Sequence, residues 1–313
     1  MKKVRMFGFA ALAALWLALV LGAWFAPVQD ISESERRKLA QMPEVTVDSI
    51  LSGKFMTDFE KFTLDQFPLR DSFRTLKALV HYNVLQQGDN NNIYVADGYA
   101  AKLEYPLNQP SVDSALEKFN HIYDSYLTGT DCKTFVTIAP DKGMYLAQAN
   151  GYPAMDYQAL FTAVEKGMDW AQFVDISGSL DVTDYYRTDT HWRQEQLLEA
   201  ARRLCEAMET GCFDAAELTQ MTVEKPFYGV YYGQAALLEI TNPEGSSDRE
   251  LVVFRDSFGS SMIPLLVKDY GKVTMVDTRY VSPELLGQYL EFDNQDVLFL
   301  YSTLILNSSG SLK

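Results

Sequence analysis

The chain has 313 residues, of which 47% are hydrophobic and 22% charged; this composition supports the packed core of one large domain or two small ones and excludes a disordered chain. Its 42 acidic and 27 basic side chains give a formal net charge of −15 at pH 7. Nucleic-acid binding needs a cationic surface that displaces counterions from phosphates, and the sequence has no basic stripe, so we exclude nucleic acid as a partner.

Residues 1–29 are expected to form a cytoplasmic tip and a transmembrane signal anchor. Basic residues near the start precede an uncharged apolar run from Phe7 to Ala26, which as a helix would span roughly 30 Å, the thickness of the hydrocarbon core. Positive charges stay on the cytoplasmic side, so the rest of the chain is expected outside the cytoplasm. Signal peptides have shorter apolar cores, and Pro27 disfavours cleavage after Ala26, so we favour an uncleaved anchor over a cleaved signal peptide.

Residues 30–85 are expected to form a juxtamembrane helical segment. The charged cluster at residues 33–38 is typical of a linker or short helix, and residues 47–84 show a helical pattern of phenylalanines among charged side chains. Pro68 interrupts this pattern, which predicts two helices or one kinked helix. We expect the segment to pack on the main domain; the alternative is a docking surface for another envelope protein.

Residues 86–313 have the pattern of an α/β domain. A hairpin with its turn at Asp97-Gly98 comes first, and buried strand patterns then alternate with helical ones. This alternation predicts a mainly parallel sheet with helices on both faces. The expected strands are residues 133–139, 172–176, 251–254, 272–277 and 296–301, and the expected helices are residues 113–126, 157–170, 194–208, 262–270 and 283–290.

Ligands of parallel sheets bind at the carboxyl ends of the strands, so polar residues just after the predicted strands should share one edge of the fold. The less regular stretch 214–250 is expected to be an insertion that could rim a pocket. The residues placed at the edge by this rule are Asp141, Lys142, Ser257, Thr278, Arg279 and Ser302.

The three cysteines, Cys132, Cys205 and Cys212, include no CxxC pair, so a zinc knuckle or a thioredoxin-type site is not expected. Cys205 and Cys212 lie close together in the sequence and could form a local disulfide outside the cytoplasm. The alternative is three buried small residues, and the sequence favours neither.

Of the three histidines, His81 and His121 fall in helical stretches, where a packing or surface role is expected. His191 lies just before a predicted helix, with Asp189 two residues earlier. Residues i and i+2 of an extended segment point the same way, so this carboxylate can hold the imidazole in one tautomer and stabilise its cation. The pair therefore has the arrangement of a base and its orienting acid.

Ser257 follows an apolar strand pattern and precedes a helical one, which would expose its hydroxyl at a sheet edge. Helix N-terminal amides at such a turn can stabilise an oxyanion, and a serine hydroxyl needs a base, which His191 could supply. The alternative is that Asp256 and Ser257 only cap the following helix.

Asp189 and His191 also supply half of a metal site, but no other histidine stands near them in the sequence. No cysteine occupies a strand-to-helix turn. We therefore expect neither a metal nor another cofactor.

The segment Asp189–Trp192, with sequence Asp-Thr-His-Trp, resembles the signature of the DHHW family of bacterial envelope proteins, with Thr190 at the second position. That family is similar to the SGNH-hydrolase-like domain of the alginate O-acetylation proteins AlgJ and AlgX. In those proteins Asp-x-His precedes the serine motif, a circularly permuted order that is also found here. Further segments fit the same pattern: Phe67–Arg70, Pro140–Lys142, Tyr185–Thr188 and Asp296–Asn307.

The resemblance implies a three-layer, circularly permuted SGNH-like fold with Asp189, His191 and Ser257 as its catalytic triad. SGNH enzymes also use an oxyanion-binding glycine and asparagine, but this sequence has no plain Gly-x-Asn-Asp block. Polar residues near the strand ends are then the substrate or oxyanion candidates, although Arg255, Lys142 and Arg187 could equally be exposed or salt-bridged. These candidates are Arg255, Asp256, Lys142, Arg187, Thr278, Arg279, Tyr280, Ser302 and Asn307.

The resemblance further implies a single-pass protein of the bacterial cell membrane that acts on its extracytoplasmic side. Its expected activity is serine-dependent acyl (acetyl) transfer or ester hydrolysis on cell-envelope or exopolysaccharide sugars. A donor from the cytoplasm would require a multi-span membrane acyltransferase as partner. The alternative is a catalytically inactive glycan-binding or scaffold protein of a polysaccharide-modification complex.

Overall fold

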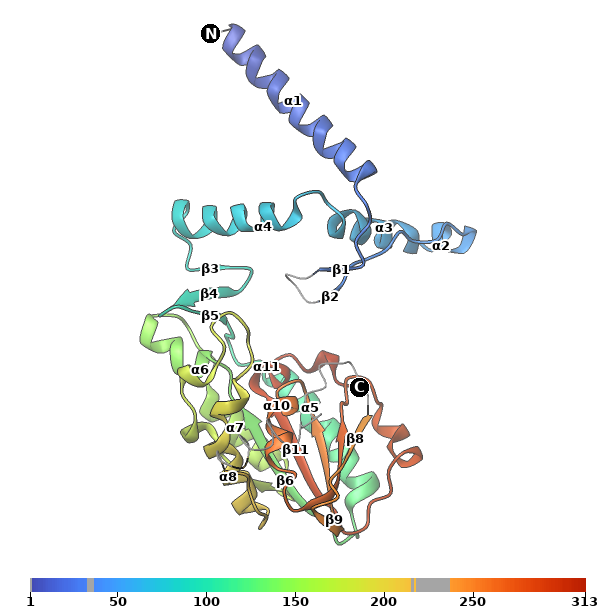
Figure 1. Cartoon of the computed structure of the whole chain (residues 1–313), viewed down its shortest axis with the longest axis vertical. Coiled ribbons are helices and arrows are strands. Elements are labelled where there is room, and N and C mark those ends of the chain that lie inside the picture. Colours follow the sequence, from blue (N-terminus) through green and yellow to red (C-terminus); the bar gives the residue numbers. More distant parts are fainter. Residues whose placement is uncertain (1, 33–36, 215–216, 218–236) are drawn as a thin grey trace. The chain divides into compact units, whose positions relative to one another are not determined.

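The computed structural model describes residues 2–32, 37–214, 217 and 237–313, which divide into two compact units, residues 1–90 and 91–313 (Figure 1). Most of the charged cluster 33–38 lies outside the described residues, as does much of the expected insertion 214–250. The pocket-rimming role predicted for that insertion therefore stays a prediction.

The first unit begins with a single long helix, α1 (Lys2–Phe25). Its segment Arg5–Phe25 is long and apolar enough to cross a membrane, by length and composition, as a membrane anchor or a signal sequence would be. Two short antiparallel strands follow, β1 (Ile31–Ser32) and β2 (Arg37–Lys38).

The expected pair of helices in residues 47–84 is divided further than Pro68 alone predicts. Gly53 has a φ of +73°, which ends one helix early, and Leu69, just after Pro68, has a φ of 57° and separates the next two. The elements are α2 (Val47–Leu51), α3 (Lys54–Asp65), α4 (Arg70–Leu79), a π-helical turn (Val80–Val84) and β3 (Asp89–Asn90).

The second unit is built on a sheet of six described strands in the order β7-β6-β11-β9-β10-β8. All neighbours are parallel except β8, which runs antiparallel to β10 at one edge, so the prediction of a mainly parallel sheet is confirmed. The strands are β6 (Lys133–Ala139), β7 (Gln172–Phe173), β8 (Leu237–Thr241), β9 (Ser246–Arg255), β10 (Tyr270–Val276) and β11 (Asp296–Ser302).

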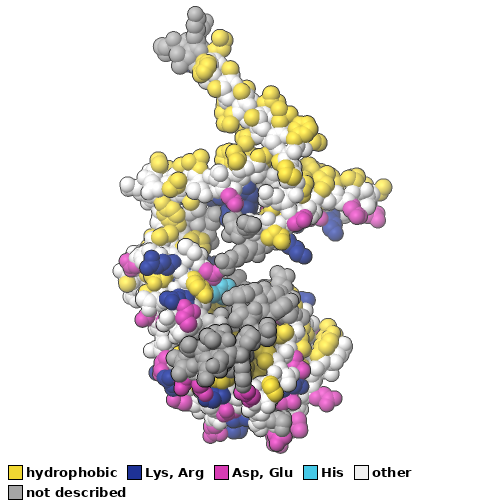
Figure 2. All heavy atoms as spheres, in the orientation of Figure 1, with side chains coloured by type: hydrophobic (Ala, Val, Ile, Leu, Met, Phe, Trp, Pro, Cys, Tyr) yellow, Lys and Arg dark blue, Asp and Glu magenta, His cyan; other side chains and the backbone are white. Residues whose placement is uncertain are grey.

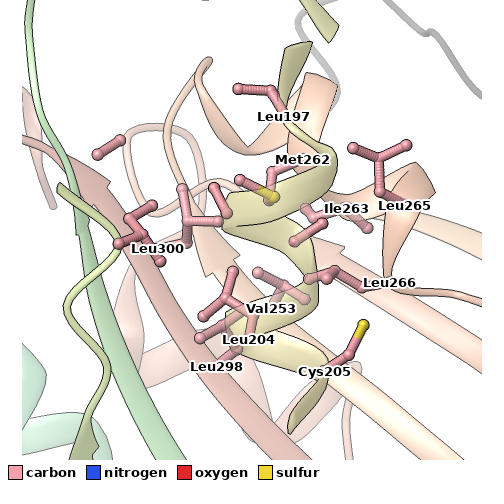
Figure 3. Packing of buried hydrophobic residues seen from close by; sticks show 14 of the residues in the cluster. Leu197, Leu204, Cys205, Val253, Met262, Ile263, Leu265, Leu266, Leu298 and Leu300 are labelled. Carbon is pink, nitrogen blue, oxygen red and sulfur yellow. The ribbon is translucent and has the colours of Figure 1, made fainter. Parts of the chain in front are cut away.

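Two apolar cores lie on opposite faces of this sheet because successive strand residues point to opposite sides. In β9, Leu251 and Val253 join the core that includes α8, whereas Val252 and Phe254 join the core that includes α5 and α7. Figure 3 shows Leu204 of α8 lying against Val253 in the first of these cores. The unit therefore has three layers. Its α-helices in the described residues are α5 (Gln109–Ile122), α6 (Gly143–Leu146), α7 (Tyr157–Gly167), α8 (Leu198–Ala207), α10 (Gly259–Met262) and α11 (Thr303–Leu306).

The hairpin prediction is confirmed by β4 (Ile93–Ala96) and β5 (Tyr99–Lys102), joined through Asp97 and Gly98, both with positive φ. The expected helix 262–270 is wrong: α10 ends at Met262, a 3₁₀ turn covers Ile263–Leu265, and β10 begins at Tyr270. Pro264 in that turn lacks the N–H that a continuing helix needs.

Two other expected helices are shortened. Residues 283–290 form a 3₁₀ helix, Pro283–Gln288, and residues 194–208 divide into a 3₁₀ turn, Gln194–Gln196, followed by α8. All three cysteines are free thiols; Cys205, in α8, is buried in the first core, and Cys212 packs against that core.

Candidate active site

Asp189, His191 and Ser257 form a continuous chain of hydrogen bonds. Asp189 Oδ1 lies 2.6 Å from His191 Nδ1, and His191 Nε2 lies 2.9 Å from Ser257 Oγ. Asp189 Oδ1 also accepts the backbone N–H of His191 at 2.9 Å, which keeps the carboxylate on the Nδ1 side of the ring. The side chains of His191 and Asp189 are 34% and 40% exposed, so a ligand at the surface can reach them.

The loop that carries the aspartate and histidine is closed by backbone hydrogen bonds. Arg193 N–H donates to Asp184 O at 2.6 Å, and Tyr186 N–H donates to His191 O at 3.1 Å. The side chain of Tyr185 points inward, where its hydroxyl donates to Pro140 O at 2.7 Å. This closed loop presents residues 189 and 191 on the same side.

Trp192 connects this loop to the serine turn. Its indole is fully buried, and Nε1–H donates to Phe258 O at 3.1 Å. The Phe258 ring packs edge-on against Trp192, with centroids 5.3 Å apart, and against the His191 ring at 4.9 Å. Phe258, the residue after Ser257, therefore packs against the imidazole of His191.

Asp256 holds the serine turn at the end of β9. Its carboxylate is fully buried: Oδ1 accepts Phe258 N–H at 2.9 Å, and Oδ2 accepts the N–H and the hydroxyl of Ser302 at 2.9 and 2.5 Å. Burial raises the pKa of Asp256, while the hydrogen bonds from Ser302 and Phe258 lower it. Asp256 thus fixes the turn to the end of the neighbouring strand β11.

Gly259 allows Arg255 to pass close to the same turn. A Cβ on Gly259 would lie 2.8 Å from Arg255 Cβ, so any side chain there would collide with the arginine stem. Arg255 is 4% exposed and its guanidinium lies 3.4 Å from Asp277 Oδ2. Arg279 binds the same carboxylate through two nitrogens, at 2.8 and 2.6 Å. Burial lowers the pKa of Arg255, and the Asp277 carboxylate opposes this shift.

Lys142 is buried, and its amine donates to backbone carbonyls. The acceptors include Tyr186 O at 2.9 Å and Asp189 O at 2.8 Å, both in the loop that carries the histidine. Arg187 is exposed, and its guanidinium lies 5.9 Å from the centre of the Tyr99 ring. Lys142 therefore contacts the loop backbone, and Arg187 lies at the surface.

The other candidates at the sheet edge have partners elsewhere. The Thr278 hydroxyl is 2.8 Å from the Tyr301 hydroxyl, and Ser302 donates to Asp256. The Asn307 side chain donates to Glu104 at 2.8 Å and accepts Asn108 N–H at 2.7 Å. Tyr280 is 38% exposed and has the Arg279 guanidinium 5.5 Å from its ring centre. Within the described residues, no hydrogen bond joins any of these four side chains to Ser257.

Two features of the site were missed in the sequence. Asp277 lies between two arginines; the predicted strand 272–277 included it, whereas β10 ends at Val276, so the rule that named Thr278 and Arg279 passed over it. The contacts of Trp192 and Phe258 carry no local signal, because they join segments far apart in the chain. In the part of the chain that the structure describes, no group of three histidine, cysteine or carboxylate side chains could hold a metal ion.

Among solved structures, a DHHW family protein from Eubacterium siraeum matches with a TM-score of 0.53 and 15% identity, over 71% of this chain and 94% of that one. Bacillus cereus PatB1, solved with a sulfonyl adduct, matches with a TM-score of 0.53 and 14% identity, over 70% and 96%. The O-acetyltransferase domain of Pseudomonas putida AlgJ matches at a TM-score of 0.43 and 12% identity, over 69% and 92%.

No protein-family profile matches the sequence, and no curated protein matches it. The structural matches show a fold: a mainly parallel sheet covered by helices, shared with the DHHW family protein and PatB1. They agree with the resemblance that the Asp189–Trp192 segment carries.

Proposed function

We propose that this protein is a membrane-anchored, extracytoplasmic acyl-transfer enzyme with Ser257 as nucleophile, His191 as general base and Asp189 as orienting acid. The observation that supports this most directly is the continuous chain from Asp189 Oδ1 through the imidazole to Ser257 Oγ, with contacts of 2.6 and 2.9 Å. Both distances lie within the reach needed for proton transfer between positioned groups.

In the proposed reaction, His191 Nε2 takes the Ser257 proton as Oγ attacks the carbonyl carbon of an acetyl ester. The tetrahedral intermediate expels the donor alcohol, which receives that proton from the imidazolium, and an acetyl-serine remains. A sugar hydroxyl, or water, then gives its proton to His191 and attacks the acetyl-serine. The product is an acetylated sugar or free acetate, and Ser257 regains its proton.

The developing oxyanion needs hydrogen-bond donors near the serine. Phe258 N–H already donates to Asp256, so we assign this role to the backbone N–H groups of Ser257 and Gly259, on either side of Phe258. This assignment needs no Gly-x-Asn-Asp block, which the sequence lacks.

The proposed acceptors are sugars of the cell envelope or of an exopolysaccharide. A partly exposed site suits a polymer that cannot enter a closed cavity, and the net charge of −15 favours a neutral glycan over a polyanion. The helix α1 is the proposed anchor, with the second unit outside the cytoplasm. A cytoplasmic acetyl donor would require a multi-span membrane acyltransferase, because one helix cannot carry a group across the bilayer.

A catalytically inactive glycan-binding or scaffold protein is the second candidate. The lack of a recognisable oxyanion block in the sequence favours it. Such a protein would use the same edge of the sheet to hold glycan without forming a covalent intermediate.

The test uses the full chain in detergent micelles with a chromogenic acetyl ester and, separately, a sulfonyl fluoride. A sulfonyl reagent is apt because PatB1, which shares the fold, was solved with a sulfonyl adduct. We expect an adduct on Ser257 in the native protein and in the control Ser114→Ala on α5, and none in Ser257→Ala or His191→Gln. Native protein that gives neither turnover nor adduct would contradict the proposed enzyme and favour the glycan-binding or scaffold function.

A further inference from the structure

Lys142 holds three segments together beneath the proposed triad. It follows the end of β6, is 2% exposed, and its Nζ donates to Ala100 O in strand β5. The same nitrogen donates to Tyr186 O at 2.9 Å and to Asp189 O at 2.8 Å in the histidine loop. A protonated lysine has three N–H donors, so these three carbonyls match its capacity, and Arg187 O lies further from the amine, at 3.5 Å.

The contact with Asp189 O connects Lys142 to the proposed triad, because the carboxylate of Asp189 meets His191. Lys142 fixes the backbone oxygen of Asp189, and the carboxylate of Asp189 lies 2.6 Å from the imidazole of His191. The same loop is further tied to the hairpin by Ala100 N–H, which donates to Arg187 O at 2.7 Å. A buried charge without such acceptors would be costly, so the carbonyls and the amine hold each other in place.

We propose that Lys142 is a positioning residue for the proposed reaction: it sets the place of Asp189 and, through it, the orientation of His191. This inference rests on the proposed function for its effect on rate, but not for its effect on geometry. It also gives the amine a role other than contact with substrate, because its donors point to the protein backbone.

The test compares Lys142→Met with Lys133→Met in the full chain. Lys133 is the first residue of β6, the strand whose far end Lys142 follows. The side chain of Lys133 is 58% exposed and meets Glu209 at 3.1 Å. Two readouts are taken: the rate of serine labelling by the sulfonyl fluoride, and the downfield proton resonance of the His191–Asp189 hydrogen bond. We expect Lys142→Met to slow labelling about a hundredfold, the size of effect that a 1 Å misplacement causes, and to lose the resonance. Lys133→Met should retain both.

If Lys142→Met does not fold, Lys142→Gln takes its place, because its amide keeps an N–H donor but ends one bond short. An unchanged resonance and rate in the Lys142 variant, or equal losses in the Lys133 variant, would overturn the positioning role. Native protein that does not label, but whose resonance disappears only in the Lys142 variant, would keep that role and overturn the proposed enzyme.

In the first unit, α4 and the π-helical turn after it expose an apolar stripe. The residues repeat at helical spacing and are 36–71% exposed, whereas the opposite side carries charged and polar groups. Figure 2 shows hydrophobic side chains gathered along the helices of this unit. The stripe consists of Leu69, Phe73, Leu76, Val80 and Val84.

The stripe begins where the apolar helix α1 ends. A Cβ on Gly22, near the end of α1, would lie 3.3 Å from Pro68 Cγ, so the two segments are in contact. Beyond the helix, Gln29 N–H donates to the Gln66 side chain at 3.0 Å, and Gln66 donates back to Gln29 O at 2.8 Å. If α1 spans the bilayer, these contacts hold the start of α4 at the membrane surface.

We infer that α4 lies in the interface of the same membrane, with this stripe facing the lipid. Amphipathic helices bind bilayers in this way by burying an apolar face at the headgroup boundary. The continuity with α1 selects lipid as the occupant rather than a protein partner.

The full chain is reconstituted into phosphatidylcholine vesicles with a fluorescent NBD label at Leu76→Cys or, as control, at Thr75→Cys on the polar side. The native cysteines are first replaced (Cys132→Ser, Cys205→Ala, Cys212→Ser). We expect a blue-shifted emission that spin-labelled lipid quenches at position 76 and not at position 75. Equal, water-like emission at both positions, or a shielded label at 76 that lipid does not quench, would overturn the proposal.

Discussion

Asp256 Oδ2 accepts both the backbone N–H and the hydroxyl of Ser302, at 2.9 and 2.5 Å. The carboxyl ends of β9 and β11 are thereby joined by one buried carboxylate, whose other oxygen holds the N–H of Phe258. The proposed nucleophile lies between residues 256 and 258, so its place depends on a neighbouring strand as much as on its own turn.

Replacing Asp256 by asparagine should loosen this connection. The amide keeps one acceptor oxygen and places its own donor against groups that also donate, which should cost about 1–3 kcal/mol in the free energy of unfolding. Serine labelling by sulfonyl fluoride should fall as well. The control is Asp296→Asn at the opposite end of β11, where a buried carboxylate accepts from Tyr270 and Arg249. Denaturant unfolding should show a loss in both variants, and labelling should fall only in the first; equal labelling would contradict the prediction.

Trp192→Phe should show whether the indole positions Ser257 in addition to stabilising the core. The change removes the hydrogen bond from the indole to Phe258 O, and it should cost about 1–3 kcal/mol because that carbonyl is left unsatisfied. Trp170→Phe is the matched control, since its indole donates to Asn120 at 2.7 Å in the other core. Both variants should lose stability, whereas slower labelling is expected for Trp192→Phe alone. If both variants label equally fast, the contact with Phe258 does not support the serine.

The amine of Lys142 should make stability depend on alkaline pH. Burial lowers its pKa to about 8, while the nearby carboxylates of Asp189 and Asp141 raise it. Between pH 8 and the ordinary lysine pKa near ~10.4, the unfolded chain binds more protons than the folded one, so the free energy of unfolding rises with pH in this window.

The slope from this one group is at most about 1.4 kcal/mol per pH unit. Lys142→Met lacks this amine. The free energy of unfolding of the native protein minus that of the variant, measured by urea unfolding from pH 7 to 10, should therefore rise with pH above pH 8. Below pH 8 the difference should be flat. A flat difference throughout that range would show that Lys142 keeps its proton in the folded state.

The strands were predictable because buried parallel strands carry continuous apolar runs. The candidate residues Lys142 and Ser257 were then found because they follow the ends of predicted strands. Residues 133–139 and 296–301 were predicted within one residue of β6 and β11. The pairing of Asp189 with His191 follows from their spacing, which brings the two side chains to one side of the loop.

The contacts around those residues were not predictable, because they join segments far apart in the chain. Nothing local to Lys142 shows that its amine meets carbonyls more than 40 residues away, and nothing local to Asp256 shows Ser302. The short α10 was missed for a local reason instead: the apolar pattern of residues 262–270 continues through Pro264, although the helix ends at Met262.

Gly259→Ala should displace the serine turn with a single methyl group. The added Cβ would lie 2.8 Å from Arg255 Cβ and 3.2 Å from its Cγ, and the arginine cannot move freely because it is buried against Asp277. Overpacking of this kind costs about 1–3 kcal/mol, and the turn must shift to relieve it, which should slow labelling of Ser257. Gly178→Ala is the control, because no atom lies within 4 Å of the Cβ it would add. Thermal unfolding and labelling rates of the two variants decide the matter: native rates in Gly259→Ala would mean that the turn accommodates the methyl group without moving the hydroxyl.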